Sequence, residues 1–210
     1  MTALVVVEGP DGAGKSTACR LVAAMLAPID ARTWHHRPPP PDRPRDPWSL
    51  ALHYAAERAS LVAAIRDGSE ESAVVIVDRW WMTAHAFALA NRGPLAVHDL
   101  AWVERDGLPT PALVVVLNAS DATLDARRPD ASAEERLARA VYRNEGVRAS
   151  WGAVVVNAEG EAREVAWRVA GLVREAIAAC SRGGGNGGHA LRMARWHADN
   201  ERVLREREGR

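Results

Sequence analysis

Residues 4–17 read Leu-Val-Val-Val-Glu-Gly-Pro-Asp-Gly-Ala-Gly-Lys-Ser-Thr, an apolar run followed by a glycine-rich turn and two hydroxyl residues. The run Leu4–Val7 is short and rich in valine, so it predicts a buried strand. Residues 9–16 satisfy the pattern G-x-x-x-x-G-K-[ST], in which glycines let backbone N–H groups turn inward around phosphate oxygens. A helix beginning after this loop would add the positive end of its dipole. The stretch therefore predicts a strand, a phosphate-binding loop and a helix, in that order.

The same loop predicts an ATP site with Mg²⁺. Lys15 is expected to reach the β- and γ-phosphates, and the Ser16 hydroxyl to ligate Mg²⁺. Lys15 is also the only lysine among the 27 lysine and arginine residues of the chain. A compact ammonium suits a phosphate-lined backbone better than a planar guanidinium does. The expected ATP-binding residues are those of the loop: Gly9, Asp11, Gly12, Ala13, Gly14, Lys15, Ser16 and Thr17.

The rest of the chain alternates apolar runs with helical patterns. Further strands are expected at Val74–Val77, Leu113–Leu117 and Val154–Val156, and at Ala31–His36. Helices are expected over residues 17–26, 48–66 and 161–180. Unalternating valine-rich runs fit strands covered on both faces. The pattern predicts an α/β fold of three layers, with a parallel sheet flanked by helices.

Composition limits the possible partners and the domain count. The chain has 210 residues, 48% of them hydrophobic, and a formal net charge of zero. Without a net charge, no bulk field recruits nucleic acid or a membrane surface. No apolar run approaches the ~20 residues of a membrane span, and no signal peptide is evident, so a cytoplasmic protein is expected. We expect one domain over residues 1–180, a glycine-rich linker at 181–188, and a charged, helical tail at 189–210.

Two further features leave alternatives open. The proline-rich segment 37–47 is expected to form an extended surface loop, either a plain connector or a substrate-side loop carrying Arg37, Arg43 or Arg45. Ser132 and Glu135 form a capping box, so a helix is expected from about residue 133. Arg136, Arg139 and Arg143 then share one face of that helix, either as a solvated stripe or as part of a lid over transferring phosphates.

Polar residues at a strand end and on a helix suggest a second ligand beside the loop. Asp78 and Arg79 follow a buried strand, and ligands of open parallel sheets bind beyond the carboxyl ends of the strands. Asp78 could hold the water shell of a metal and Arg79 a second phosphate; the alternative is a structural ion pair. Tyr54 and Arg58 lie four residues apart, so on a helix they share a face and could stack on a planar base.

Together these residues resemble the thymidylate kinase family, within the nucleoside monophosphate kinases of the P-loop fold. The resemblance covers residues 1–180 and rests on the order of four motifs: Glu8–Thr17 for the loop, Tyr54–Arg58 for the aromatic-x-A-x-R helix, Asp78–Trp80 for the D-R-aromatic strand end, and Thr83–Phe87 for the S-x-x-A-[YF] pattern. It implies a P-loop kinase fold, a nucleoside monophosphate acceptor and a homodimer.

The resemblance also implies roles for residues on the acceptor side. Asp11 would bind the 3′-hydroxyl of a deoxyribose, and Arg79, with Arg37, the 5′-phosphate. Tyr54 and Arg58 would hold the base, and Phe87 would crowd the 2′ position. Gly12 stands where some family members carry a catalytic arginine, which favours a lid arginine among Arg127, Arg128, Arg136 and Arg139. The expected catalytic residues are Lys15, Arg79, Arg127, Arg128 and Arg136.

Three positions depart from the family pattern. Ala88 stands where the family often has Gln, Asn or Thr, and it leads us to expect relaxed selectivity for the base; Ala112 and Asn118 replace two family aspartates. The sequence thus predicts transfer of phosphate from ATP to dTMP or another deoxypyrimidine monophosphate. The alternatives are the same chemistry on a modified nucleotide or another small acceptor, and a nucleotide-binding ATPase that is not a kinase.

Overall fold

The structure is a computed structural model that describes residues 2–36, 47–66, 72–91 and 108–182. Arg37, Arg43 and Arg45 lie outside the described residues, as do residues 183–188 of the expected linker and the whole of the tail. Expectations for those segments, and the domain boundaries built on them, stay predictions.

A five-stranded sheet forms the centre of the fold, and every neighbouring pair of strands is parallel. Its strands are β1 (Ala3–Glu8), β2 (Ala31–His35), β3 (Val74–Asp78), β4 (Leu113–Asn118) and β5 (Ala153–Asn157). Their order across the sheet is β2-β3-β1-β4-β5. All five coincide with runs that the sequence predicts as strands. Four of them read as continuous valine-rich segments because they are largely buried, whereas the edge strand β2 is more exposed and contains no valine.

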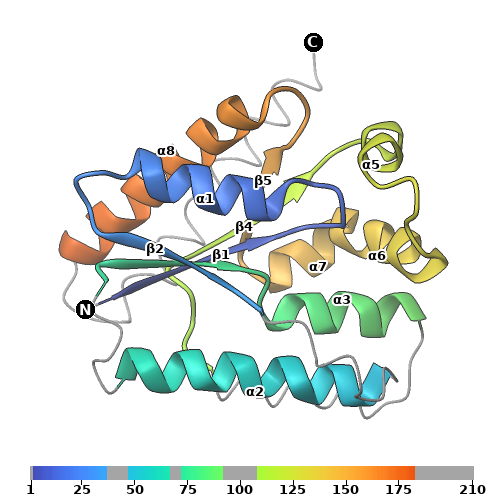
Figure 1. The fold of residues 1–210 in the computed structure, drawn as a ribbon, viewed down its shortest axis with the longest axis horizontal. Coiled ribbons are helices and arrows are strands. Elements are labelled where there is room, and N and C mark those ends of the chain that lie inside the picture. Colours follow the sequence, from blue (N-terminus) through green and yellow to red (C-terminus); the bar gives the residue numbers. More distant parts are fainter. Residues whose placement is uncertain (1, 37–46, 67–71, 92–107, 183–210) are drawn as a thin grey trace.

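Helices cover both faces of the sheet, as Figure 1 shows, with α1 and α8 on one face and α2 and α3 on the other. The described helices are α1 (Lys15–Met25), α2 (Pro47–Arg66), α3 (Trp81–Asn91), α5 (Asp121–Arg127), α6 (Ala133–Arg143), α7 (Glu145–Ser150) and α8 (Ala162–Arg182). The expected three-layer α/β architecture is confirmed. Within the described part of the chain, no helix combines the length and apolar character needed to cross a membrane.

The core has two apolar layers, one on each side of the sheet. Val5 and Val7 of β1 pack in the layer that includes residues of α1 and α8. Val6 packs in the opposite layer, with Trp80, Tyr142 and other large side chains. This alternation is what the two-residue repeat of a strand requires when both faces are covered.

Three helices were not among the sequence predictions. Helix α3 carries apolar residues on most sides, so it shows no amphipathic stripe that would distinguish it from other buried segments. Helices α5 and α7 have seven and six residues, too few for a periodic pattern. A local feature did mark α5, because the Ser120 hydroxyl caps it by accepting from the N–H of Thr123.

The strand register brings the polar residues to one edge of the sheet. Val7 of β1 pairs directly with Asp78 of β3, so the residues that follow both strands emerge side by side. The glycine loop follows β1, and Arg79 follows β3. The carboxyl edge of the sheet is therefore where a candidate site forms.

Candidate active site

The glycine loop wraps tightly from β1 to the start of α1. Gly9 has a φ of +139°, and a Cβ added there would lie 2.5 Å from the carbonyl O of Leu117, so only glycine fits. Gly14 caps α1 with a φ of 88° and offers no side-chain bond to the first helical turn. The backbone N–H groups of that turn are thus available to an anion. Thr17 lies half-buried in the same turn, and Ala13 is buried behind the loop.

Lys15 is folded into the loop rather than extended into solvent. Its Nζ donates to the carbonyl O of Pro10 at 2.8 Å and lies 3.7 Å from Oδ1 of Asp11. Burial lowers the pKa of Lys15 to about 8, and the charge of Arg79 adds to this, while Asp11 opposes it. A phosphate placed here would restore the ordinary stability of the ammonium, because it would supply the missing negative charge.

Ser16 and Asp78 meet at the start of α1 and form the candidate magnesium site. The Ser16 hydroxyl donates to Oδ2 of Asp78 at 2.5 Å, and Nδ1 of His35 lies 3.1 Å from the same oxygen. The other oxygen, Oδ1, is buried and has no hydrogen-bond partner. Such an oxygen-only donor pair fits Mg²⁺, which keeps several waters and phosphate oxygens as its remaining ligands. Among the described residues, no group of three or more His, Cys, Asp or Glu could hold a metal by itself.

Arg79 points across the loop toward Asp11. Its Nη2 donates to Oδ1 of Asp11, and its Nη1 donates to Oγ1 of Thr83 at 3.3 Å. Burial raises the pKa of Asp11, but Arg79 and Lys15 outweigh it and hold that pKa below its usual range. Asp11 is therefore a carboxylate held between two cations, one from the loop and one from the end of β3.

Glu8 is a site residue for which the sequence alone predicts no role. It is completely buried, and its carboxylate accepts from the N–H of Trp80 at 2.6 Å, from Oγ1 of Thr83 at 2.7 Å and from the hydroxyl of Tyr142 at 3.0 Å. Burial raises its pKa, with Arg79 and these hydrogen bonds opposing the rise. Glu8 thus ties β1 to α3 and α6 directly behind Arg79. The sequence does carry a signal for this role, because Glu8 ends a strand that is predicted to be buried, and a buried charge needs hydrogen-bond or ionic partners.

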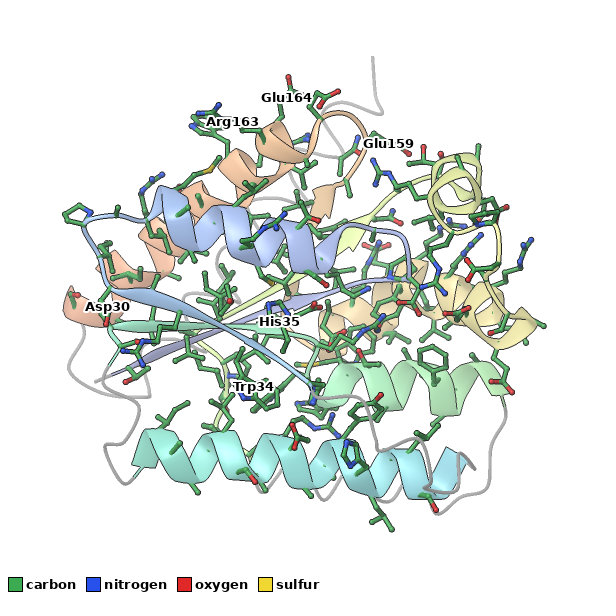
Figure 2. The ribbon with its side chains drawn as sticks, in the orientation of Figure 1. Asp30, Trp34, His35, Glu159, Arg163 and Glu164 are labelled. Carbon is green, nitrogen blue, oxygen red and sulfur yellow. The ribbon has the colours of Figure 1, made fainter. Side chains whose placement is uncertain are left out.

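The expected base-binding residues form a second group on the other face of the sheet. Tyr54 and Arg58 lie on α2, and the Arg58 side chain is buried. The Tyr54 ring contacts His36 edge-on, with 5.2 Å between centroids. Figure 2 shows Trp34 and His35 leaving β2 on opposite sides, which places Trp34 and the next-but-one residue, His36, toward α2.

Residues of α3 complete this side of the site. Phe87 lies four residues after Thr83, so it shares the face of α3 that carries the Arg79 contact. Ala88 is buried and packs against Ala51 of α2. The small side chain at this position therefore serves the packing of α2 on α3. Relaxed base selectivity, expected because alanine cannot hydrogen-bond a base, stays a prediction.

Two of the expected lid arginines adjoin the glycine loop. Arg127 Nη1 lies 3.4 Å from the carbonyl O of Gly12 and also donates to the carbonyl O of Ala158 at 3.2 Å. Arg128 donates to Asp130 at 3.0 Å, and its Cγ lies 3.4 Å from where a Cβ on Gly12 would be. Gly12 also has a φ of +85°, a conformation that strains a residue with a side chain, and a Cβ there would lie 3.2 Å from the carbonyl O of Leu124. Arginine is thus supplied to the loop by the end of α5.

The other lid arginines are engaged in ion pairs between α5 and α6. Arg139, only 4% exposed, lies 2.9 Å from Asp125 and 3.2 Å from Asp121. Arg143 also pairs with Asp121, at 2.8 Å, and Arg136 lies 3.6 Å from Asp125. The basic face of α6 is therefore directed at α5 in this structure. Arg136 is the member of this group with the weakest pairing.

Comparison with known proteins agrees with this geometry. The family model described as thymidylate kinase matches residues 7–151. A thymidylate kinase of Pseudomonas fluorescens is 32% identical over 158 residues, covering 66% of this chain and 73% of that protein. The enzyme of the same name from Pelotomaculum thermopropionicum is 31% identical over 127 residues, covering 53% of this chain and 57% of that protein.

A solved structure of thymidylate kinase from Candida albicans matches the fold with a TM-score of 0.63, at 16% identity, over 83% of this chain and 92% of that chain. At that identity the likeness concerns the fold alone, and it agrees with the parallel sheet and its covering helices. The sequence relatives and the family model, which spans most of the chain, decide the family. The chain belongs to the thymidylate kinase family of nucleoside monophosphate kinases.

Proposed function

We propose that the protein transfers the γ-phosphoryl group of ATP to the 5′-phosphate of dTMP, giving ADP and dTDP. The observation that carries this proposal is the position of Asp11, whose carboxylate contacts both Lys15 and Arg79. Both cations approach the same carboxylate oxygen, Oδ1, so they lie close enough to hold two phosphate groups next to each other. A kinase needs this arrangement, whereas a nucleotide-binding switch does not.

The glycine loop forms the donor side of this proposal. Gly9, Gly12 and Gly14 shape the backbone around phosphate oxygens, and the uncapped start of α1 adds its dipole. Lys15 would leave Pro10 and bind the β- and γ-phosphates of ATP. Ser16 and Asp78 would hold Mg²⁺, which when bound supplies positive charge at the phosphates.

Arg79 and its neighbours form the acceptor side. The Arg79 guanidinium would bind the 5′-phosphate of the acceptor, and Asp11 would bind the 3′-hydroxyl of its deoxyribose. Tyr54 and Arg58 would hold the base, with Phe87 near the 2′ position. Arg37 belongs to the same prediction but lies outside the described residues.

Transfer needs no covalent intermediate on this chain. The acceptor phosphate oxygen attacks in line, and the ADP oxygen leaves. Lys15 and Arg79 neutralise charge on the phosphates from two directions, and Arg127 or Arg128 would add charge from the end of α5. The protein therefore acts by binding, orienting and electrostatic stabilisation.

An acceptor panel tests this proposal. We expect kcat/KM to be highest for dTMP and dUMP, which share the 2′-deoxyribose and the carbonyl at position 4 of the base. Values for dCMP and UMP should be lower, the first because of its base and the second because of its 2′-hydroxyl. Equal values for UMP and dTMP would contradict the sugar argument. If the protein bound ATP and phosphorylated none of the four, the thymidylate assignment would be wrong and another acceptor would have to be sought.

The cytoplasmic location remains a prediction from the sequence, and the homodimer remains a prediction from the family resemblance. Sedimentation velocity of the purified chain measures the second directly. We expect a mass near twice that of the 22.7 kDa chain. A single species at the mass of one chain would contradict the dimer.

A further inference from the structure

His36 lies directly after β2 and joins the two parts of the proposed acceptor side. Its Nε2 lies 3.3 Å from the backbone carbonyl O of Arg79. Its ring packs edge-on against Trp34, at 4.6 Å between centroids, and against Tyr54, at 5.2 Å. The His36 imidazole thus contacts Tyr54, which is expected to hold the base, and the backbone of Arg79, which is expected to bind the acceptor phosphate.

The hydrogen bond to Arg79 fixes the tautomer of this imidazole. A carbonyl oxygen only accepts hydrogen bonds, so the proton must be on Nε2. Burial lowers the pKa of His36 to about 3, and the charge of Arg58 adds to this, so the ring is neutral at physiological pH. Nδ1 is then a bare acceptor, and it is buried without a hydrogen-bond partner. The ring is therefore held by its other nitrogen and by the two aromatic contacts.

The backbone that His36 contacts has an unusual conformation. Arg79 has a φ of 75°, and within the described ranges it is the one non-glycine residue with a positive φ. A left-handed conformation at a residue with a Cβ is strained and persists only where the surroundings hold it. Both backbone polar groups of Arg79 are held here. Its N–H donates to the carbonyl O of Val7 at 3.0 Å, and its carbonyl accepts from His36.

We infer that His36 is a positioning residue, whose Nε2–H holds the peptide after Arg79 so that the guanidinium is directed at Asp11 and at the acceptor phosphate. The identity of that ligand rests on the proposed function. The inference itself rests on the hydrogen bond, on the aromatic contacts that orient the ring, and on the strained backbone that it holds. His36 acts through Arg79 and does not touch the reacting atoms.

Two variants separate the hydrogen bond from the packing of the ring. His36→Phe keeps an aromatic ring between Trp34 and Tyr54 but removes the donor. His36→Gln removes the ring but keeps an amide N–H at about the position of Nε2. The matched control is His53→Phe, because His53 also contacts the Tyr54 ring, at 5.3 Å between centroids. Each protein is titrated calorimetrically with dTMP and with thymidine, which lacks the phosphate, and KM is measured for dTMP and ATP.

We expect His36→Phe to bind dTMP roughly tenfold more weakly, the usual effect of losing one hydrogen bond. Its KM for dTMP should rise by the same factor, with KM for ATP and kcat nearly unchanged, because the lost binding is common to the ground and transition states. Thymidine binding by His36→Phe should not change, because thymidine has no phosphate for Arg79 to bind. His36→Gln should keep dTMP affinity within about threefold of wild type, and His53→Phe should match wild type.

Two results would overturn the inference: dTMP binding by His36→Phe equal to that of wild type, or equal losses for dTMP and thymidine, which would show a packing role only. If the Gln variant does not fold, the comparison of dTMP with thymidine in the Phe variant still decides. A failure of the proposed function looks different. In that case wild type itself neither binds nor phosphorylates dTMP, and both the proposed function and this inference are wrong.

Discussion

Asp11 shows how much of this site depends on single side chains. Its carboxylate is held between Lys15 and Arg79, and these two cations keep it charged in spite of its burial. Asp11 lowers the electrostatic cost of burying Lys15 and Arg79, whereas the two cations repel each other. A bound phosphate would enter this group as a further anion, so Lys15 and Arg79 are the residues whose partners must change when substrates bind.

Lys15→Ala tests the donor side at the residue scale. We expect kcat to fall by about a hundredfold or more, because a charge aimed at the transferring phosphate is lost. The fold should persist, since the loop backbone is unchanged, and a cooperative thermal unfolding transition checks this. Lys15→Arg is the matched control and should not restore activity, because the guanidinium is larger and planar. Near-normal turnover in Lys15→Ala would contradict the assignment of the loop.

At the scale of elements, the sequence predicted what is decided locally. The strands were found because runs such as Val74–Val77 are buried on both faces, and α6 because Ser132 and Glu135 form a capping box, which the structure confirms. The glycine loop was predicted because its pattern lies within eight consecutive residues, 9–16, and does not depend on distant parts of the chain. The roles of Glu8 and His36 were not, because they depend on residues that fold against them from far along the chain, at positions 79, 83 and 142.

Helix α5 brings Arg127 and Arg128 to the loop, whereas α6 uses Arg139 to bind α5. Alanine substitutions should therefore separate into two classes. Among Arg127→Ala, Arg128→Ala and Arg136→Ala, at least one should lower kcat on the order of 10³-fold, as for loss of an arginine that stabilises transferring phosphate. Arg139→Ala should instead lower the midpoint of urea unfolding, because Asp121 and Asp125 lose their buried partner. If the first three variants all stay within a few-fold of wild type, the lid hypothesis is wrong.

The pairing of α5 with α6 also predicts a pH dependence of stability. The hydrogen bond from Arg143 lowers the pKa of Asp121 to about 2, from an ordinary value of 3.8. The folded state therefore binds the Asp121 proton less tightly than the unfolded state does. The contribution of Asp121 to the free energy of unfolding is complete above about pH 4 and is lost as the pH falls toward 2. Asp121 is largely exposed, so the contribution is at most about 1 kcal/mol.

Urea unfolding of wild type and Asp121→Asn at several pH values measures this contribution. The midpoint of the variant should lie below that of wild type at pH 6, and the difference should shrink toward pH 2.5. A difference that is constant over this range would show that Asp121 acts through something other than its charge.

At the scale of the whole molecule, the parallel sheet places three strand ends at one edge, and each brings one part of the site. The end of β1 brings the phosphate loop, the end of β3 brings Asp78 and Arg79, and the end of β2 brings His35 and His36. The order β2-β3-β1 puts Arg79 between the loop and His36, which contacts Tyr54 of α2. The fold thus explains why the donor and acceptor groups adjoin although they lie far apart in the sequence.

The fate of the γ-phosphate tests the proposed phosphoryl transfer to dTMP most directly. Purified protein is incubated with Mg²⁺, dTMP and ATP carrying a labelled γ-phosphate, and the products are separated. We expect the label to appear in dTDP, in a reaction that depends on dTMP and is lost in Lys15→Ala. If the label is found only in inorganic phosphate, at a rate that does not depend on dTMP, the protein is an ATPase and the proposed kinase activity is wrong.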